Sequence, residues 1–450
     1  MAAAAAHPPR YRRIPVGGLS PPGLATVNTV HVVGAGIAGL ACAVRLARSG
    51  VRVIVHEGAK VAGGRCRSFQ DRHLGRIDNG NHLFLGANQA LFGYLREIGN
   101  PNGLRATDLV FPFVDLADGG RWGLRPNWGR VPWWILHSGR RVPGSRAGDY
   151  LAAVRLGRMS AETRVAEALS SNQLYRPLWR PLCEAILNTP PERASARLLG
   201  TVLDLTLAKG GAMCRPYLCA IDLADALIDP ALAALSRMSA EVRFGDRLSA
   251  LLMTDHVVAL DFVTGRLEVG RGDQVVLAVP WWDAHRLMPG LVPELSGAAI
   301  VNAHFMYSGP PAFGHPFVGV LGGAAQWVFM REGLLSVTVS AADAMVRESS
   351  EDIAGRLWRE VCAILNLPHG PIPPFRIVKE RRATLAHTPA ALAARPPAAT
   401  SAANLFLAGD WTDTGLPCTV ESAVRSGHRA AELCLAKETQ STARELATLG

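Results

Sequence analysis

The first regular pattern of apolar positions along the chain begins at Val30. An apolar run covers 30–33, small residues and glycines follow, and a second apolar run covers 51–55 and ends at Glu57. Short apolar runs bounded by glycine are typical of buried strands, and the stretch of small residues between them predicts a helix. The pattern therefore predicts a strand-helix-strand unit at the start of an α/β fold.

Later patterns extend this picture. Apolar positions spaced by three and four predict helices over 160–207, broken by four prolines, and over 350–365. Strands are predicted at 241–251, at 273–280 and just after Asn404, and a closing helix is predicted to begin near Thr419. The chain thus alternates strands and helices, which favours a sheet covered by helices.

The first unit carries a GxGxxG spacing followed by an acid. Glycine allows a tight turn at Gly34, close approach of a pyrophosphate at Gly36 and close packing of the helix at Gly39. Glu57 stands 18 residues after the last glycine, where an acid accepts a hydrogen bond from a ribose hydroxyl. A glycine turn without a cofactor is the alternative, but all parts of the dinucleotide unit are present. The predicted contacts are Gly34, Gly36, Ile37, Ala38, Gly39 and Glu57.

Two further motifs point to the same cofactor region. A GGR triplet, with Gly64 and Arg65, follows six residues after the acid, and an arginine there can pair with phosphate, although a solvated arginine in a plain turn is the simpler alternative. The closing strand delivers Gly409 and Asp410 before the helix that begins near Thr419. The positive end of that helix would stabilise an anion on a reduced flavin.

These motifs resemble the amine oxidase and carotenoid desaturase superfamily of FAD enzymes. Within it, the strings NTPPERASARL (188–198) and AGDWTDTGLP (408–417) are similar to the hydroxysqualene dehydroxylases, also described as squalene-associated FAD-dependent desaturases. The resemblance implies FAD as cofactor and adds further FAD contacts at Gly80, Asn81, His82, Leu248, Thr419 and Val420.

The resemblance also implies a discontinuous arrangement of domains. A Rossmann-type FAD-binding domain is expected from 29–100, 236–290 and 376–436, and a mixed sheet-and-helix substrate domain from 101–235 and 291–375. Residues 1–28, rich in alanine, proline and glycine, predict a disordered extension, and 437–450 a C-terminal tail.

The implied reaction is reduction of hydroxysqualene to squalene, which needs a proton donor at the leaving hydroxyl and a hydride from reduced flavin. His82 and Asp413 are the first candidates for the donor, with Asp78 and Glu421 behind them. An ordinary hydrogen-bonded loop histidine is the alternative for His82. A carotenoid-type polyene desaturase and a lipid-binding escort without catalysis remain alternative functions. No second GxGxxG unit offers a nicotinamide site, so the electron donor is left open.

Charge and composition limit the classes of binding partner that we expect. The net charge is +10 and the pI near 9.5, yet no nucleic-acid-reading motif is present, so a membrane surface is preferred over nucleic acid. Trp133, Trp134, Arg140 and Arg141 are the predicted contact with lipid headgroups, although a packed edge of the substrate domain explains them nearly as well. The eight cysteines form no CxxC pair, which predicts reduced thiols, no metal site and a cytoplasmic protein. Together with the basic charge and the Trp and Arg cluster, this predicts peripheral association with the inner face of the membrane.

Overall fold

A computed structural model describes residues 11–13, 28–310, 314–368 and 370–449. Most of the predicted disordered extension, 1–28, lies outside the described residues. Its described part, β1 (Tyr11–Arg13), pairs in parallel with β12 (Leu248–Met253).

Five parallel strands form the sheet that begins at the glycine motif. Their order is β11-β3-β2-β15-β21, with β2 (Thr29–Val33), β3 (Arg52–Glu57), β11 (Glu241–Phe244), β15 (Gln274–Leu277) and β21 (Leu405–Leu407). The helix α1 (Ile37–Arg48) connects β2 to β3. The predicted strand-helix-strand unit and the α/β fold are therefore confirmed.

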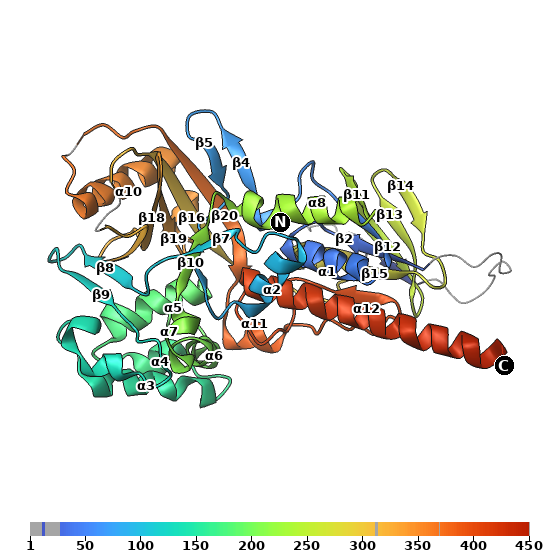
Figure 1. Ribbon diagram of the computed structural model, residues 1–450, viewed down its shortest axis with the longest axis horizontal. Helices are drawn as coiled ribbons and strands as arrows, with labels where there is room; N and C mark the ends of the chain where they lie inside the picture. The colour runs from blue at the N-terminus through green and yellow to red at the C-terminus, as the bar shows by residue number, and fades with distance from the viewer. Residues whose placement is uncertain (1–10, 14–27, 311–313, 369, 450) are drawn as a thin grey trace, which may run out of the picture.

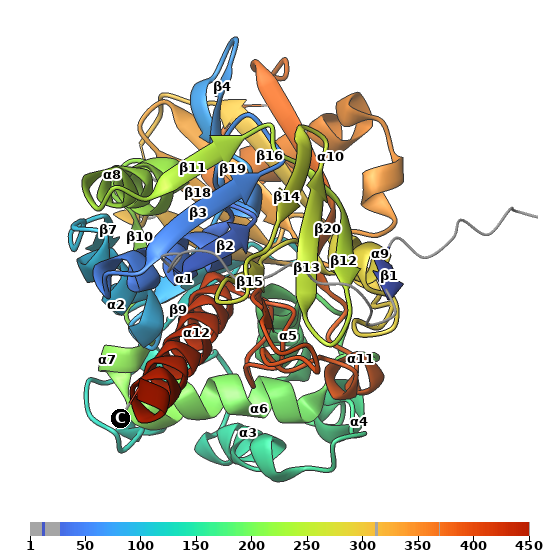
Figure 2. The ribbon, with the colours of Figure 1, turned by 90° about the vertical axis from the view of Figure 1, so that its right-hand side faces the viewer.

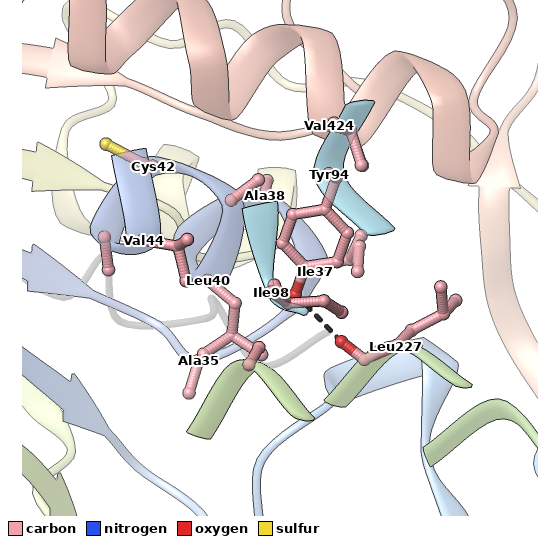
Figure 3. Close-up of a cluster of buried hydrophobic side chains, with 14 of the residues drawn as sticks. Ala35, Ile37, Ala38, Leu40, Cys42, Val44, Tyr94, Ile98, Leu227 and Val424 are labelled. Carbon is pink, nitrogen blue, oxygen red and sulfur yellow. Dashed lines mark hydrogen bonds between the residues drawn. The ribbon is translucent and has the colours of Figure 1, made fainter. Parts of the chain in front are cut away.

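One face of this sheet is covered by helices that enclose α1. The helices are α2 (Gln89–Glu97), α8 (Asp229–Arg237) and α12 (Val420–Leu449). Figure 3 shows the side chains that fill the space, where Tyr94 from α2 lies among Leu40, Ile98 and Val424 and donates its hydroxyl to Leu227 O at 2.8 Å. The region predicted as a tail, 437–450, continues α12 as far as Leu449, and this end of the helix extends away from the rest of the chain (Figure 1).

The opposite face packs against a small antiparallel sheet and a helix. The antiparallel strands are β12, β13 (Val257–Phe262) and β14 (Gly265–Glu268), and the helix is α9 (Trp281–Leu287). Val275, Leu277 and Leu407 of the parallel sheet share one buried cluster with Leu251 and Leu260 of the antiparallel sheet. Both faces of the central strands are thus buried, which explains their continuous apolar runs.

A second large sheet has seven strands in the order β20-β16-β19-β18-β17-β8-β9. The strands are β8 (Phe111–Asp115), β9 (Arg121–Leu124), β16 (Gly297–Met306), β17 (Phe317–Leu321), β18 (Trp327–Arg331), β19 (Leu334–Val339) and β20 (Phe375–Leu385). The helix α10 (Ser350–Leu365), at the predicted position, packs on one face. Because β20 pairs with β16, the predicted boundary at 376 falls inside this sheet; the division into domains stays a prediction.

Helices below the second sheet form a region with a core of their own (Figures 1 and 2). The helices are α3 (Leu151–Val154), α4 (Val165–Leu169), α5 (Arg180–Leu187), α6 (Ala196–Leu205) and α7 (Gly211–Cys214). Pro190 and Pro191 lie between α5 and α6, whereas Pro181 is the second residue of α5 and follows directly on a π-helical turn (Tyr175–Trp179) that contains Pro177.

Short elements connect these layers. They are a three-stranded sheet of β6 (Phe84–Leu85), β10 (Pro216–Cys219) and β7 (Leu104–Ala106), the hairpin of β4 (Ser68–Asp71) and β5 (Gly75–Asp78), and α11 (Pro389–Ala393). Among the described helices, none is long and apolar enough to cross a bilayer.

Candidate cofactor and active site

The glycine-rich turn after β2 is tightly packed at two positions and open at the third. A Cβ atom on Gly34, whose φ is +111°, would lie 2.5 Å from Ala278 O, and one on Gly39 would lie 1.9 Å from Gly34 O. A Cβ atom on Gly36 would meet nothing within 4 Å. Gly34 and Gly39 are therefore required by the protein's own packing, whereas Gly36 borders free space, which suits a bound group.

The start of α1 offers hydrogen-bond donors toward this space. Within the described part of the chain, the N–H groups of Gly36 and Ala38 make no hydrogen bond to protein. The first N–H groups of a helix have no partner inside the helix and carry its partial positive charge, so they suit a phosphate.

Glu57 fixes the turn to the end of β3. Its Oε2 accepts from Ala35 N at 2.7 Å and its Oε1 accepts from Ala59 N at 2.8 Å. A carboxylate offers about four acceptor positions, so two remain for a ribose hydroxyl. The ribose role of Glu57 stays a prediction that this geometry permits.

Arg65 and Asp410, predicted separately, lie together. Arg65 Nη2 donates to Asp410 Oδ1 at 2.6 Å, Nη1 donates to Ala383 O at 2.5 Å, and the guanidinium lies 5.7 Å from the centre of the Trp281 ring. The expected phosphate contact of Arg65 thus has to share the guanidinium with a protein carboxylate and a carbonyl. The GGR loop and the closing loop meet at this ion pair.

The closing loop, 408–419, is held in shape by an arginine that the sequence did not single out. The buried side chain of Arg395 donates to the carbonyl oxygens of Asp410 at 2.7 Å, Leu416 at 2.5 Å and Trp411 at 3.3 Å, and also to that of Thr412. Gly409 is required here, because a Cβ atom would lie 2.3 Å from the Trp411 indole nitrogen. The protein's own hydrogen bonds and packing therefore define the shape of this loop.

The loop ends at the start of α12. Thr419 Oγ1 accepts from Ser422 N at 3.2 Å, which is an N-cap, while the N–H groups of Thr419 and Val420 donate to no described residue. These two N–H groups are available to a ligand. Glu421 turns away from this end and caps α2 instead, with Ala90 N at 3.1 Å and Leu91 N at 2.9 Å from its carboxylate.

The predicted flavin-facing segment, Gly80 to His82, is held by two residues of the second sheet that the sequence did not reveal. Asn81 Nδ2 donates to Thr338 Oγ1 at 3.0 Å, and Thr338 Oγ1 donates to Asn302 Oδ1 at 2.8 Å. A Cβ atom on Gly80 would lie 3.2 Å from Asn302 Nδ2. Since Asn302 and Thr338 lie on paired strands, no local sequence signal could have linked them to this segment.

His82 is half-buried and lies nearly parallel to the Phe84 ring, 5.9 Å from it at an angle of 11°. Burial and then the positive charge of Arg65 lower the pKa of His82 to about 4. The imidazole is therefore neutral near pH 7. Its neighbour Leu83 packs against the aromatic cluster of Phe113, Phe317, Leu321 and Trp327, so the segment lies beside an apolar region.

Asp413 lies on an exposed turn of the closing loop, where its Oδ1 accepts from Gly415 N at 3.3 Å. No described contact joins it to His82. Asp78 is buried and fully engaged, accepting from Ser68 at 2.6 Å and Leu223 N at 3.0 Å and pairing with Arg331. Leu248 is buried at the start of β12, and the adenine contact assigned to its backbone stays a prediction, as do the proton-donor roles.

These features fit a dinucleotide with a flavin. The open position at Gly36, the free N–H groups at the starts of α1 and α12, and the Arg65 and Asp410 pair are contributed by segments that the parallel sheet brings to its carboxyl edge. Two helix N-termini thus carry unpartnered N–H groups of the kind that suit negatively charged ligand groups.

The family profile described as flavin containing amine oxidoreductase matches residues 37–435. An oxidoreductase from Methanosarcina mazei has the same fold, with a TM-score of 0.70 at 14% identity, over 90% of this chain and 100% of its own. The class of the protein is therefore a flavin-dependent oxidoreductase, and the predictions of a flavin and of an enzyme are confirmed.

Relatives with higher sequence identity to this chain identify its family within the flavin-dependent oxidoreductases. The hydroxysqualene dehydroxylase of Rhodopseudomonas palustris is 46% identical over 91% of this chain and 99% of its own, and that of Sinorhizobium fredii is 43% identical over the same shares. A zeta-carotene desaturase of Synechocystis sp. is 25% identical over 91% of this chain and 97% of its own. The chain belongs to the hydroxysqualene dehydroxylase family, as the strings at 188–198 and 408–417 predict.

Proposed function

We propose that this protein binds FAD and reduces hydroxysqualene to squalene. The observation that carries the proposal is the meeting of Arg65 and Asp410, which joins the two cofactor loops in a chain that is 46% identical over 91% of its length to a hydroxysqualene dehydroxylase. The carotenoid desaturase alternative has less support, because the corresponding relative is only 25% identical.

In this proposal, each part of the site binds a different part of FAD or of the substrate. The N–H groups of Gly36 and Ala38 bind the pyrophosphate, Glu57 the ribose, and the start of α12 the pyrimidine end of the flavin. Asn302 and Thr338 hold the Gly80 to His82 segment against the ring. The buried cluster next to Leu83 makes the surroundings of this segment apolar, which favours an isoprenoid chain over water.

The reaction replaces a C–O bond by a C–H bond. Reduced FAD, when bound, supplies a hydride to the allylic carbon, and a proton added to the departing oxygen makes water the leaving group. His82 is the first candidate to deliver that proton because it lies in the segment assigned to the flavin. The donor would be the small protonated fraction of His82, because burial and Arg65 keep most rings neutral near pH 7, whereas Asp413 is exposed on its turn.

The test is anaerobic incubation of the photoreduced holoenzyme with hydroxysqualene, followed by identification of the product. Squalene, formed with reoxidation of one flavin per product, supports the proposal. Flavin that stays reduced with hydroxysqualene, together with reduction of the oxidised holoenzyme by a C40 polyene, would favour a desaturase. A purified protein that binds no FAD would favour the lipid-binding escort.

We further propose that the protein is cytoplasmic and docks on the anionic inner face of the membrane, where such an apolar substrate dissolves. Two adjoining segments supply exposed apolar side chains: Trp128, Val131, Trp133, Leu136, Leu151 and Val154. The guanidinium of Arg140 lies 4.8 Å from the ring centre of Trp133, and that of Arg215 lies 5.6 Å from that of Trp128. Aromatic side chains covered by arginines are expected at lipid headgroups.

The predicted contact residue Trp134 does not belong to this surface. Its side chain is 4% exposed and packs edge-on against Tyr150, at 5.2 Å between ring centres, whereas Trp133 is 43% exposed. Within a short 3-10 helix, neighbouring residues point in different directions, so only one member of the pair reaches solvent. Trp134 stabilises the fold and brings segment 128–136 against the start of α3.

A further inference from the structure

His387 lies between the carboxyl end of α5 and the amino end of α12, and its imidazole is hydrogen-bonded to both. Nδ1 lies 2.5 Å from Leu187 O, the last residue of α5, and Nε2 accepts from Cys418 N at 2.8 Å. The backbone of His387 is held too, since its N–H donates to Thr189 Oγ1 at 2.9 Å and its carbonyl accepts from Ser195 N at 3.0 Å. The side chain is 0% exposed.

These partners determine the tautomer of the ring. A carbonyl oxygen can only accept and a backbone N–H can only donate, so Nδ1 carries the proton and Nε2 is the acceptor. A second proton on Nε2 would face the N–H of Cys418, donor against donor. Burial lowers the pKa of His387 to about 4, in agreement with a ring that stays neutral.

The bridge fixes the chain just ahead of the free helix end. Cys418 stands two residues before Val420, where α12 begins. With the N–H of Cys418 held by His387, the next two N–H groups, those of Thr419 and Val420, are left without described protein partners at the positive end of the helix. Their direction depends on where the bridge places Cys418.

The other end of the bridge lies in the helical region below the second sheet. Leu187 ends α5, and Thr189 and Ser195 belong to the string at 188–198 that marks the family. Asn188, with a φ of +46°, fastens the same corner to the second sheet, where its Nδ2 donates to Ala298 O at 3.2 Å and to Thr384 Oγ1 at 3.0 Å. His387 thus joins the first family string to Cys418, the residue that directly follows the second string.

We infer that His387 is a positioning residue that sets the reduction potential of the bound flavin by holding the amino end of α12 in place. The helix end stabilises the negative charge that a reduced flavin gains on its pyrimidine ring, and this stabilisation falls off within the first turn. The inference rests on the proposed placement of the flavin at this helix end, and not on the identity of the substrate.

Two substitutions separate the two ends of the bridge. In His387→Asn the side-chain amide nitrogen takes the place of Nδ1 and keeps the bond to Leu187 O, but nothing reaches Cys418 N. In His387→Gln the longer side chain places its carbonyl oxygen near Nε2 and keeps the acceptor for Cys418 N. His285→Asn is the matched control, because His285 also bonds a backbone carbonyl through Nδ1, Val292 O at 2.8 Å, but on α9.

The experiment measures the midpoint potential of bound FAD in each holoenzyme without substrate, together with the flavin absorbance spectrum and thermal unfolding. We expect His387→Asn to make two-electron reduction about tenfold less favourable, which is a fall of about 30 mV. His387→Gln and His285→Asn should keep the wild-type potential.

A wild-type potential in folded His387→Asn overturns the inference, and so does an equal fall in the Asn and Gln variants. If His387→Asn does not fold, His387→Ala takes its place, because it too removes the acceptor for Cys418 N: a fall of about 30 mV supports the inference and the wild-type potential overturns it. Because hydroxysqualene is absent from these measurements, a negative product assay would refute the proposed reaction without touching this result.

Discussion

Arg65 Nη2 donates to Asp410 Oδ1 at 2.6 Å and so joins two loops whose residues stand 345 positions apart in the sequence. The carboxylate side chain is 6% exposed and the guanidinium 29% exposed. A carboxylate so deeply buried is costly to leave without a partner of opposite charge. The GGR loop and the closing loop therefore stabilise each other through this ion pair, which contains no group from FAD.

We expect Arg65→Ala to lower the free energy of unfolding by about 2 to 4 kcal/mol, because it leaves Asp410 buried without its partner. Urea unfolding of the apoprotein measures this. Arg164→Ala is the matched control, since the pair of Arg164 with Glu167 is 3.8 Å long and more than half exposed on both sides, and its loss should cost less than about 0.5 kcal/mol. If Arg65→Ala and Arg164→Ala lower the free energy of unfolding by the same amount, the ion pair of Arg65 with Asp410 does not stabilise the fold.

Glu57→Ala should weaken FAD binding about 10- to 150-fold, which corresponds to about 1.5 to 3 kcal/mol for lost hydrogen bonds to a charged group. The loss combines the ribose acceptor with the bonds that Glu57 accepts from Ala35 N and Ala59 N. Titration of the apoprotein with FAD, followed by flavin fluorescence, gives the dissociation constant. Glu268→Ala, an exposed acid on β14, is the control and should bind FAD as the wild type does.

Local spacing was sufficient to predict the parts of the site that local backbone geometry builds. Gly39 packs on Gly34 O and Glu57 bonds Ala35 N, so these contacts lie within one strand-helix-strand unit and their pattern is visible within 28 residues; the packing of Gly34 against Ala278 is not local. The positive end of α12 was likewise predictable from the strand, loop and helix that follow one another after Asn404.

Residues that act across the fold could not be found in this way. Asn302 reaches the segment predicted to face the flavin only because the second sheet folds against it, and Arg395 reaches the closing loop only because the chain folds back on it. Among neighbouring tryptophans, the apolar pattern alone did not distinguish the buried Trp134 from the exposed Trp133, because a 3-10 turn has no long period to read.

Liposome binding tests the exposed apolar surface. Trp133→Ser and Trp128→Ser should reduce sedimentation with vesicles containing anionic phospholipid, each by about tenfold or less, because each tryptophan buries only part of its area in the headgroup region. The flavin spectrum should not change. Trp133→Phe serves as the conservative control, and sedimentation of the double serine variant equal to that of the wild type would remove this surface from consideration.

Two fully buried histidines should make the protein sensitive to acid. Burial lowers the pKa of His304 and of His387 to about 4, and each is 1% exposed or less. The unfolded chain, with a histidine pKa near 6.5, binds more protons than the folded chain, so the stabilisation is complete above about pH 6.5 and is lost as the pH falls toward 4.

Each of these histidines contributes a slope of up to about 1.4 kcal/mol per pH unit in that window. Urea unfolding between pH 8 and 5 measures the slope for the wild type. His387→Gln removes one titrating group while keeping an acceptor for Cys418 N. It should therefore lower the slope of the unfolding free energy against pH by up to about 1.4 kcal/mol per pH unit. An unfolding free energy independent of pH between 6.5 and 5 would contradict the assignment of both rings as neutral in the folded state.

The proton donor can be identified from the pH dependence of one chemical step. With a pKa of about 4, only roughly one His82 ring in a thousand is protonated at pH 7. If the imidazolium of His82 donates the proton to the leaving hydroxyl, reoxidation of reduced flavin by hydroxysqualene should accelerate about tenfold for each unit that the pH falls from 8 to 6. His82→Asn should abolish this slope and slow the step at pH 6 by about 10² to 10⁴ fold while FAD stays bound.

Asp413→Asn is the companion variant, because Asp413 lies on the closing loop but makes no described contact with His82. Stopped-flow traces in which only Asp413→Asn is slow would transfer the role to Asp413, and wild-type rates in both variants would exclude the pair.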